Sequence, residues 1–419
     1  NEFVDELNIK LISSNKRPVA CMATLRGDHP KIIDFIHVKK NANFNRWHFN
    51  ISVWVNENLF SQKTDPLLLN TIVESAHYCA EPGILFFDRY NRDNPTPDWT
   101  YSSVAPCGEI AMASGEACQF SYINLSYLVK KVGATYVFDW EQFIIATKIL
   151  TRLLDSAVQM SGEYSGLNLD RVLAKRRIGV GITGFAGLLI NLHLPYASDE
   201  AKKLAQQISE TLDYYTKQES VQMAKKRGRF PIFQESLYTQ PAWIERKQQN
   251  RELYLGQTAW VDLNQSIINE GIRNASTSSF APTGTSSRIV RATPQFEPCY
   301  DLSQIFADDV LMERVAKILS AEQVAELQKS PLTYDESHVL GTARRIHYKH
   351  HIEMQAAFQS FADDATSKTI NLPQDSTVDD VMTAMRLAFE RNLKGLTVFR
   401  DGCLDERDPA QIDSGHGID

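Results

Sequence analysis

Residues 376–399 read STVDDVMTAMRLAFERNLKGLTVF and carry the pattern that decides the fold class. Four apolar side chains in this stretch recur every three or four residues, which places them on one face of a helix that starts at Ser376. The helix is expected to end near Gly395, and Leu396–Phe399 has the length and composition of a returning strand. A helix that leads directly into a strand is typical of α/β proteins. The four apolar residues are Val378, Met382, Met385 and Phe389.

The same two patterns recur through the rest of the chain. Ser198 is a good helix N-cap, and Gly228 is a natural stop after three cationic residues. Strands that alternate with long helices predict the α/β class for the whole chain. The further strands are expected at 47–56, 83–87 and 277–280, and the further helices at 139–161 and 199–227.

Composition and charge exclude several classes of protein. The 419 residues include 43% hydrophobic and 23% charged side chains, which is the balance of a folded globular chain. The formal charge of −7 does not suit a protein that coats nucleic acid, because neutralising phosphates requires excess cations. No apolar run approaches the roughly 20 residues of a membrane span. Six cysteines without a CxxC pair favour a reducing, cytoplasmic setting.

The first stretch with chemical potential is Ala105-Pro-Cys-Gly-Glu109, followed by Cys118. Pro106 and Gly108 exclude a regular helix and favour an extended loop. In an extended backbone, residues two apart share a face, so the thiol of Cys107 and the carboxylate of Glu109 would point the same way. The alternative is a buried structural cysteine beside a surface glutamate.

The second stretch is Phe280-Ala-Pro-Thr-Gly-Thr-Ser-Ser287. Glycine and small hydroxyl residues after a strand present backbone N–H groups and hydroxyls that suit a phosphate. It is not a Walker A loop, because the Gly-Lys-[Ser/Thr] ending is absent. The alternative reading is an ordinary helix N-cap.

Taken together, these stretches resemble the catalytic subunit of ribonucleotide reductase, in its adenosylcobalamin-dependent (class II) form. The matching motifs fall in the family's order from about residue 10 to residue 402. They are His29–Phe35, Glu81–Asp88, Pro106–Glu109, Glu116–Cys118, Ile123–Leu125, Gly271–Asn274, Ala281–Thr285, Glu297-Pro298, Ser367–Pro373 and Lys394–Gly402.

The resemblance implies a fold and a domain division. The family has a ten-stranded α/β barrel with a central finger loop, and this chain would carry the later strands. Residues 1–402 would form the catalytic barrel portion, with the finger loop at about 103–112 and a phosphate-binding turn at 281–287. Residues 403–419, which are rich in Asp and Gly, are expected to be a flexible tail.

The resemblance also implies roles in the reduction of ribonucleoside di- or triphosphates to deoxyribonucleotides. Cys107 would become a thiyl radical that takes the 3′ hydrogen of the ribose, and Glu109 would remove the 3′-hydroxyl proton. Cys118 would be one of two cysteines that supply reducing equivalents and end as a disulfide. A thioredoxin-like protein would then be the reductant.

Substrate and effector residues follow from the same resemblance. The finger loop at Ala105 and Gly108 would contact the substrate, and the turn would hold its phosphates. A deoxynucleotide effector would be reported to the active site by a loop containing Asn15, Lys16 and Arg17. The phosphate-binding residues would be Pro282, Thr283, Gly284, Thr285, Ser286 and Ser287.

The expected cofactor is adenosylcobalamin. Reductases driven by a di-iron subunit relay the radical through paired tyrosines, whereas the corresponding stretch here, Leu396–Arg400, contains none. A cobalamin enzyme generates its radical beside the cysteine and needs no relay. Pro-Thr-Gly-Thr in place of Pro-Ser-Glu-Thr at 282–285 agrees with this form. No metal site is predicted, because His347, His350 and His351 lack further ligands at a suitable spacing.

Three departures from the family pattern matter. Position 105 is Ala where the family has Asn. The partner of Cys118 would come from a strand N-terminal to this sequence, so an N-terminal polypeptide is expected to complete the barrel. The family's C-terminal cysteine pair is absent, and Cys403 stands alone. The alternatives are a non-catalytic relative that binds nucleotide or a subunit, and a di-iron-driven reductase subunit.

Overall fold

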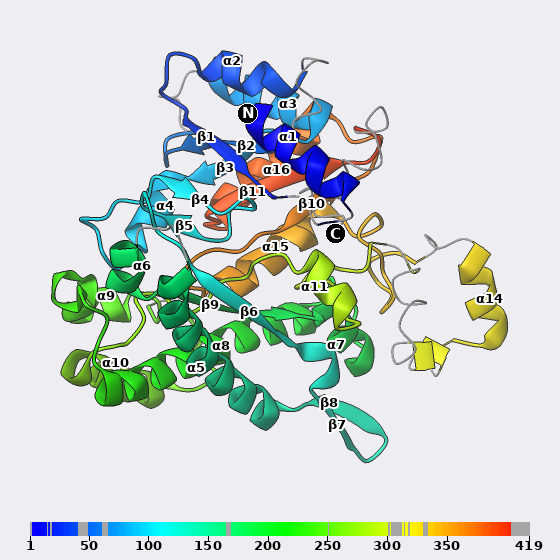
Figure 1. The fold of residues 1–419 in the computed structure, drawn as a ribbon. Coiled ribbons are helices and arrows are strands. Elements are labelled where there is room, and N and C mark those ends of the chain that lie inside the picture. Colours follow the sequence, from blue (N-terminus) through cyan, green and yellow to red (C-terminus); the bar gives the residue numbers. More distant parts are fainter. Residues whose placement is uncertain are drawn as a thin grey trace.

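The computed structural model places most of the chain. It describes residues 2–14, 16, 19–40, 49–60, 66–164, 169–249, 251–300, 302, 312–313, 315–316, 319–329 and 334–403. Within these ranges, strands and helices alternate as the sequence predicts, which confirms the α/β class (Figure 1).

A five-stranded sheet forms one half of the molecule, in the order β1-β2-β3-β11-β10. β1, β2 and β3 run parallel, β11 runs antiparallel to β3, and β10 is parallel to β11. The predicted strands at 47–56, 83–87 and 396–399 are all present in it. The five strands are Met22–Arg26, Asn50–Val55, Gly83–Phe86, Gly395–Arg400 and Thr369–Leu372 for β1, β2, β3, β11 and β10.

The wall continues beyond β10 into the other half of the molecule. The backbone at Phe280 bridges in parallel to Thr366, and Ser278 bridges in parallel to Val180 of β9 (Ile178–Thr183). β9 pairs in parallel with β6 (Gln119–Asn124). The segment 277–280 therefore lies between the two halves, where a strand was expected.

The prediction was a ten-stranded α/β barrel of which this chain carries the later strands, and the structure shows an α/β wall without a closed barrel among the described residues. Within the described residues the wall runs from β1 to β6, and no pairing joins β1 to β6. The chain thus forms an open α/β wall whose two edge strands, β1 and β6, lie at its ends.

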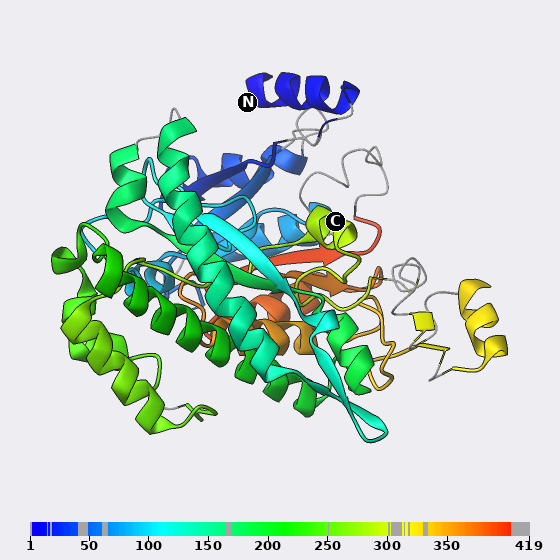
Figure 2. The same cartoon turned by 60° about the horizontal axis from the view of Figure 1, so that its bottom comes forward.

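Two hairpins extend from this wall. β4 (Ser103–Val104) pairs with β5 (Ala111–Met112), and β7 (Val129–Val132) pairs with β8 (Thr135–Phe138). Figure 2 shows the β7–β8 hairpin projecting away from the body.

Helices cover the outside of the wall. α3 and α16 pack against each other and against β11, and α5, α8 and α15 pack on the side of β6 and β9. The α-helices are α1 Glu2–Ser13, α2 Ile32–His37, α3 Pro66–Cys79, α4 Phe87–Arg92, α5 Trp140–Tyr164, α6 Leu169–Lys175, α7 Phe185–Leu192, α8 Asp199–Arg227, α9 Pro241–Glu245, α10 Gln257–Glu270, α11 Gly284–Ile289, α14 Ala321–Lys329, α15 Tyr348–Gln359 and α16 Val378–Glu390. The 3₁₀ helices are η1 Val38–Lys40, η2 Leu125–Tyr127, η3 Phe233–Glu235 and η4 Leu237–Thr239.

The predicted helix ends are confirmed at α8 and shift slightly at α16. Ser198 caps α8 by accepting a hydrogen bond from the Ala201 N–H, and Gly228 ends it with φ of 84°. The N-cap of α16 is Thr377, one residue later than the expected start at Ser376, because Thr377 forms a capping box with Asp380. It ends at Glu390, so residues 391–394 form a turn before β11.

Two apolar clusters hold the wall to its helices. One lies between the five-stranded sheet and α2, α3 and α16, and the other lies between β6, β9 and helices α5, α7, α8 and α15. In the second cluster, the Phe296 and Phe358 rings stack with centroids 4.5 Å apart.

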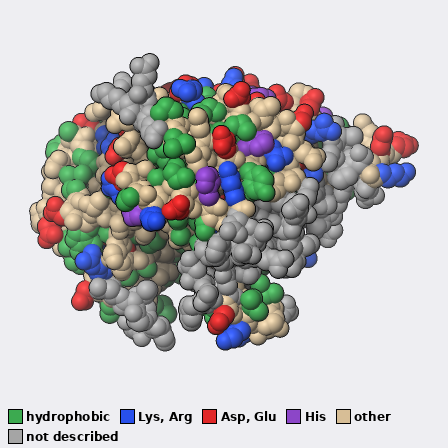
Figure 3. Space-filling view, turned by 90° about the horizontal axis from the view of Figure 1, so that it is seen from above, with side chains coloured by type: hydrophobic (Ala, Val, Ile, Leu, Met, Phe, Trp, Pro, Cys, Tyr) green, Lys and Arg blue, Asp and Glu red, His purple; other side chains and the backbone are tan. Residues whose placement is uncertain are grey.

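The described surface shows mixed charge. Acidic and basic side chains are interspersed over the face shown in Figure 3. No described helix has both the length and the apolar character needed to cross a membrane.

Candidate active site

The β4–β5 hairpin presents the sequence-predicted cysteine and glutamate at its tip. Ser103 pairs with Met112 and Val104 with Ala111, so residues 105–110 form the connection. The Ala105 N–H donates to the Ile110 carbonyl at 2.8 Å, and the Gly108 N–H donates to the Ala105 carbonyl at 2.9 Å. The tip is therefore a tight turn, and the predicted extended loop is wrong. The turn forms because Gly108 adopts φ of 78°, which favours glycine.

Contacts from distant parts of the wall hold this tip in place. The Tyr90 hydroxyl donates to the Gly108 carbonyl at 2.5 Å, and the Asn50 side-chain amide donates to the Pro106 carbonyl at 3.1 Å. The Glu109 carbonyl accepts from the Ser279 hydroxyl at 3.0 Å and from the Ala365 N–H at 2.9 Å. These partners come from β2, from α4, from the 277–280 segment and from the chain before β10. Segments far apart in the sequence therefore hold the tip against the wall.

Cys107 is half-buried and lines a small pocket. β11 supplies one wall of the pocket, through Gly395, Leu396 and Thr397. Lys368 lines it as well, and this buried lysine is paired with Glu297. The other lining residues are Met22, Ser52, Leu85, Tyr90, Gly108, Gln355 and Thr366.

Glu109 is buried directly behind the cysteine. Its carboxylate accepts hydrogen bonds from its own N–H and from the Cys107 N–H, which brings the two predicted residues together even though the backbone turns. Burial raises the pKa of Glu109 to about 7, and the nearby Asp364 carboxylate adds to this rise while the two backbone N–H groups oppose it. A carboxyl with this pKa can accept or release a proton near neutral pH.

Cys118 immediately precedes β6, and its side chain lies beside Gly179 of β9. A Cβ atom placed on Gly179 would lie 3.0 Å from the Ser279 Cβ and 3.8 Å from the Cys118 Sγ, so the glycine leaves room for the thiol. Ser279 in turn holds the Glu109 carbonyl. Burial raises the pKa of Cys118 far above its usual range, with a further contribution from Asp364, so the thiol is protonated at neutral pH.

A buried charge network beneath the hairpin was not anticipated from the sequence. The Arg177 guanidinium donates to Glu116 Oε2 at 3.0 Å, to the Ser276 hydroxyl at 3.2 Å and to the Ala111 carbonyl at 2.5 Å. It also pairs with Asp364. Arg177 therefore joins the second hairpin strand to the segment that carries Cys118. Among these residues, the sequence singled out only Glu116, as part of the Glu116-Ala-Cys118 motif, and it predicted no function for that glutamate.

The predicted phosphate turn leads from the 277–280 segment into α11. The buried Thr283 hydroxyl lies 2.8 Å from the Thr183 hydroxyl and accepts from the Gln295 N–H at 2.6 Å. The buried Ser287 hydroxyl donates to the Gly284 carbonyl at 2.7 Å. These two hydroxyls stabilise the turn itself, so an incoming phosphate would meet mainly the half-buried Thr285 and Ser286.

The turn is placed near the hairpin by the chain between them. The Pro282 carbonyl accepts from the Tyr122 hydroxyl at 3.3 Å, and the Phe280 N–H donates to the Ala365 carbonyl at 3.1 Å. The Ala365 N–H donates to the Glu109 carbonyl, which also accepts from the Ser279 hydroxyl. The turn at 281–287 therefore starts two residues after Ser279, a residue that contacts the finger hairpin.

The predicted effector residues fall largely outside the structure. Asn15 and Arg17 lie outside the described residues, as do residues 404–419 of the predicted tail. Lys16 is exposed, and its N–H donates to the Leu11 carbonyl at 2.8 Å. The effector prediction therefore stays a prediction.

Comparison with known proteins agrees with this geometry. The family model described as ribonucleotide reductase, barrel domain, matches residues 5–65 and 63–399. A vitamin B12-dependent ribonucleoside-diphosphate reductase of Mycobacterium tuberculosis is 29% identical over 427 residues, covering 92% of this chain and 57% of the relative. A protein of the same name from Thermoplasma acidophilum is 29% identical over 429 residues, covering 92% of this chain and 51% of the relative. The chain thus spans about half the length of these relatives.

One solved structure shows the same fold. The alpha subunit of the class Id ribonucleotide reductase of Actinobacillus ureae superposes with a TM-score of 0.72 at 19% identity. The match covers 92% of this chain and 71% of that chain.

Proposed function

The chain belongs to the ribonucleotide reductase barrel-domain family, and from this premise we propose that it carries the catalytic centre of an adenosylcobalamin-dependent ribonucleotide reductase. The substrate would be a ribonucleoside di- or triphosphate, and the product the 2′-deoxyribonucleotide. The observation that carries the proposal is the anchored turn on which Cys107 lines a pocket and donates its backbone N–H to the buried Glu109 carboxylate.

In this proposal Cys107 and Glu109 act on the same ribose. Cys107, in its thiyl form, takes the hydrogen atom from C3′ and later returns one. Glu109 accepts the 3′-hydroxyl proton, for which a pKa of about 7 is well suited. The fixed turn matters because both groups must reach neighbouring atoms of one sugar ring.

Cys118 would supply part of the reducing equivalents. Two thiols give two electrons and two protons, the 2′-hydroxyl leaves as water, and the thiols become a disulfide. The high pKa of Cys118 keeps its proton available for this step. A dithiol reductant of the thioredoxin type would then reduce the disulfide by thiol exchange.

The turn at 281–287 would hold the phosphates of the substrate. Its support is the position of Thr285 and Ser286 at the start of α11, one short segment beyond the contact between Phe280 and Ala365. N–H groups and hydroxyls at this point suit an anion.

The residues beside Cys107 are compatible with the proposed cofactor. β11 lines the pocket there through Gly395, Leu396 and Thr397 and contributes no tyrosine. Gly395 and Thr397 would hold the cofactor next to Cys107. When bound, the cofactor supplies the radical that Cys107 takes up.

Further partners follow from the open wall. β1 and β6 are its edge strands in the described part of the chain, so strands of an N-terminal polypeptide would extend it. A deoxynucleotide effector would act through the segment around Lys16.

A second candidate, a non-catalytic nucleotide-binding relative, is favoured by one observation. Ala105 begins the turn and cannot offer the side-chain amide expected there, and one such hydrogen bond is worth about 1.5–3 kcal/mol when it involves a charged group.

The proposal is tested by replacing Cys107. Deoxynucleotide formation is measured for the wild type, Cys107→Ser and the matched control Cys299→Ser, whose cysteine is buried in a separate cluster with Leu302 and Leu340. We expect Cys107→Ser to abolish product with unchanged thermal stability, and Cys299→Ser to retain it. Turnover by Cys107→Ser would refute the assignment.

A further inference from the structure

A second polar pocket is lined by Lys394, the residue that precedes Gly395 of the Cys107 pocket. It has a volume of about 340 Å³ and is lined by residues from the end of α4, from positions 246, 247 and 251, from α15 and from the turn after α16. One carboxylate, Asp93, lines it. Six cationic residues line it with Asp93: Arg92, Arg246, Lys247, Arg251, Arg391 and Lys394. We call it the Arg251 pocket.

The single carboxylate is shared among three of these cations. Asp93 lies 3.0 Å from the Lys394 ammonium, 3.4 Å from the Arg246 guanidinium and 3.5 Å from the Arg92 guanidinium. One negative charge cannot neutralise three positive charges, so this wall of the pocket keeps a positive excess.

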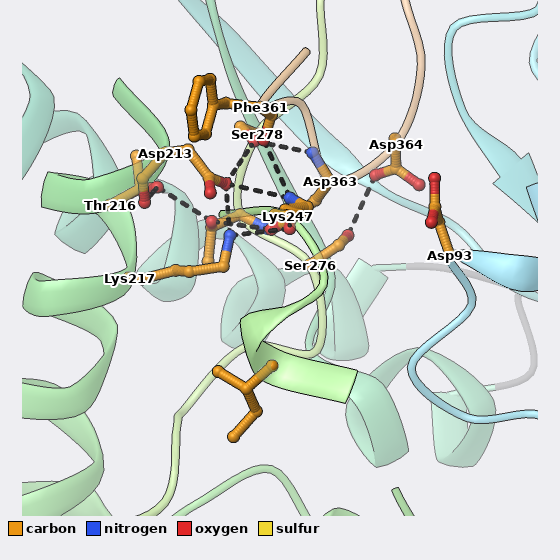
Figure 4. Close-up of polar contacts among 12 residues, drawn as sticks. Asp93, Asp213, Thr216, Lys217, Lys247, Ser276, Ser278, Phe361, Asp363 and Asp364 are labelled. Carbon is orange, nitrogen blue, oxygen red and sulfur yellow. Dashed lines mark hydrogen bonds and ion pairs between the residues drawn. The ribbon is translucent and has the colours of Figure 1, made fainter. Parts of the chain in front are cut away.

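Two other cations have partners outside the pocket. The Lys247 ammonium lies 2.6 Å from Asp363 and 3.3 Å from Asp213, in the buried cluster that Figure 4 shows. The Arg391 guanidinium lies 3.4 Å from Glu353. Their ion pairs do not reduce the excess around Asp93.

Arg251 differs from the other cations of the pocket in its ion pairing. Within the described part of the chain no carboxylate lies within ion-pair distance of it, and its guanidinium lies 5.3 Å from the centroid of the Phe361 ring. Desolvation against the pocket wall lowers the pKa of Arg251. The Asp93 and Asp213 carboxylates oppose this effect, whereas the Arg246 and Arg92 cations lower the pKa further. A bound anion would relieve this crowding of positive charge.

The Arg251 pocket is distinct from the turn at 281–287. β10 and β11 run parallel, and so do the segments at Phe280 and Thr366. Lys394 immediately precedes β11, whereas the turn follows the end of the 277–280 segment. The pocket therefore lies where these strands begin, and the turn lies where they end.

We propose that the Arg251 pocket binds the linked phosphate groups of a small polyphosphate ligand. Guanidinium groups present paired donors that match phosphate oxygens, and the pocket offers four of them. The excess of cations over the single carboxylate suits two or more linked phosphates better than one. The ligand is either an inorganic polyphosphate or the polyphosphate tail of a nucleotide, since both carry the same chemistry.

The test is a binding titration of the 419-residue chain by calorimetry. Inorganic tripolyphosphate and a nucleoside triphosphate are titrated separately into the wild type, Arg251→Ala, Arg251→Lys and Arg386→Ala. Arg386 is the matched control, because it is an exposed arginine of α16 that lies over Phe60 and outside the pocket. Ser286→Ala, in the turn, reports any polyphosphate bound there instead.

We expect Arg251→Ala to weaken tripolyphosphate binding at least tenfold, Arg251→Lys to restore much of it, and Arg386→Ala to stay within twofold of the wild type. Equal affinities for tripolyphosphate and the nucleoside triphosphate would show that the pocket recognises the phosphates alone. Tighter binding of the nucleotide would show that the pocket also contacts the nucleoside.

Two results would overturn the proposal. One is an unchanged affinity in Arg251→Ala, and the other is a loss caused by Ser286→Ala in its place. The titration measures binding only, so a failure to detect deoxynucleotide formation leaves its outcome unaffected.

Discussion

Glu109 is buried, although the role that we propose for it needs its charge. Its carboxylate is held by the N–H groups of Cys107 and of Glu109 itself, but one oxygen, Oε2, is buried and accepts no hydrogen bond from the described residues. An oxygen left in this state costs stability and is available to a substrate hydroxyl. In the proposed mechanism this oxygen would accept the proton of the substrate, and its burial without a partner lowers the stability of the protein before substrate binds.

The raised pKa of Glu109 makes a prediction about stability. Because the folded-state pKa of about 7 exceeds the usual value, the folded protein favours the protonated carboxyl. The contribution of this group to stability is full below the unfolded pKa of about 4.3 and is lost as the pH rises through 7. Glu109→Gln lacks this loss, so at pH 8 the variant should be more stable than the wild type by up to roughly 3 kcal/mol.

Urea denaturation at pH 5 and pH 8 measures this difference. The gap between variant and wild type should widen at the higher pH, while product formation by the variant falls by about two orders of magnitude or more. An identical gap at both pH values would show that Glu109 is not buried as the structure places it.

At the residue scale, the sequence predicted candidate reactive side chains but not the residues that hold them in place. Cys107, Glu109 and Cys118 were identified by motifs that survive in a single sequence. Arg177 and Tyr90 were not, because their contacts come from segments 66 and 18 residues away from the hairpin residues they hold. Such pairings depend on the tertiary fold, which no local pattern encodes.

At the element scale, the finger hairpin depends on one backbone conformation. Gly108 has φ of 78°, and a Cβ there would lie 3.2 Å from the Leu85 side chain and 3.5 Å from the Tyr90 hydroxyl. The sequence suggested an extended loop because Pro and Gly exclude a helix without choosing between a turn and a strand. The choice is made by the hydrogen bond between Gly108 and Ala105, which closes the turn.

Gly108→Ala should therefore disturb the site more than the fold. The positive φ alone costs about 1–2 kcal/mol for alanine. Gly133→Ala is a matched control, since Gly133 has φ of 61° in the β7–β8 turn and its added Cβ would meet nothing within 4 Å.

Thermal unfolding and product formation separate the two effects. Both variants should lose about 1–2 kcal/mol of stability, but only Gly108→Ala should lose at least tenfold in turnover. Equal turnover in the two variants would mean that the position of the tip does not matter for catalysis.

At the scale of the whole molecule, buried charges join the two halves of the wall. Asp363 accepts from the Thr277 N–H at 2.8 Å and lies 2.7 Å from the Lys217 ammonium and 2.6 Å from the Lys247 ammonium (Figure 4). Although burial opposes it, these two cations hold the pKa of Asp363 far below its usual range. The cluster ties α8 and the 246–251 segment to the chain that contacts Glu109.

Asp363→Asn should be strongly destabilising. It leaves two buried ammonium groups with only Asp213 to share, which costs about 3–5 kcal/mol when one partner of a buried pair is removed. The exposed pair of Lys225 and Glu270, 3.5 Å apart, provides the control, because Glu270→Gln should cost at most about 1 kcal/mol. Urea denaturation of both variants gives the comparison, and similar losses would contradict the structural role of the cluster.

The overall architecture was predictable only as far as local periodicity reaches. The α/β class, α5, α8, α16 and the strands at β2, β3 and β11 follow from apolar spacing and capping residues. The family resemblance predicted an incomplete barrel, but local patterns did not show that β1 and β6 would be its edge strands, because strand pairing is set by the tertiary fold. The buried Lys and Asp cluster was also missed, since charged residues in a helical pattern such as α8 ordinarily face solvent.

The central claim is that Cys107 begins a cobalamin-dependent reduction of ribonucleotides. The most direct measurement is deoxynucleotide formation by this chain, with any N-terminal polypeptide encoded beside it, in the presence and absence of adenosylcobalamin and with a small dithiol throughout. Ala105→Asn is assayed in parallel. The account predicts product only when adenosylcobalamin is present, and no less of it after Ala105→Asn. Nucleotide binding without product, in both the wild type and Ala105→Asn, would contradict it.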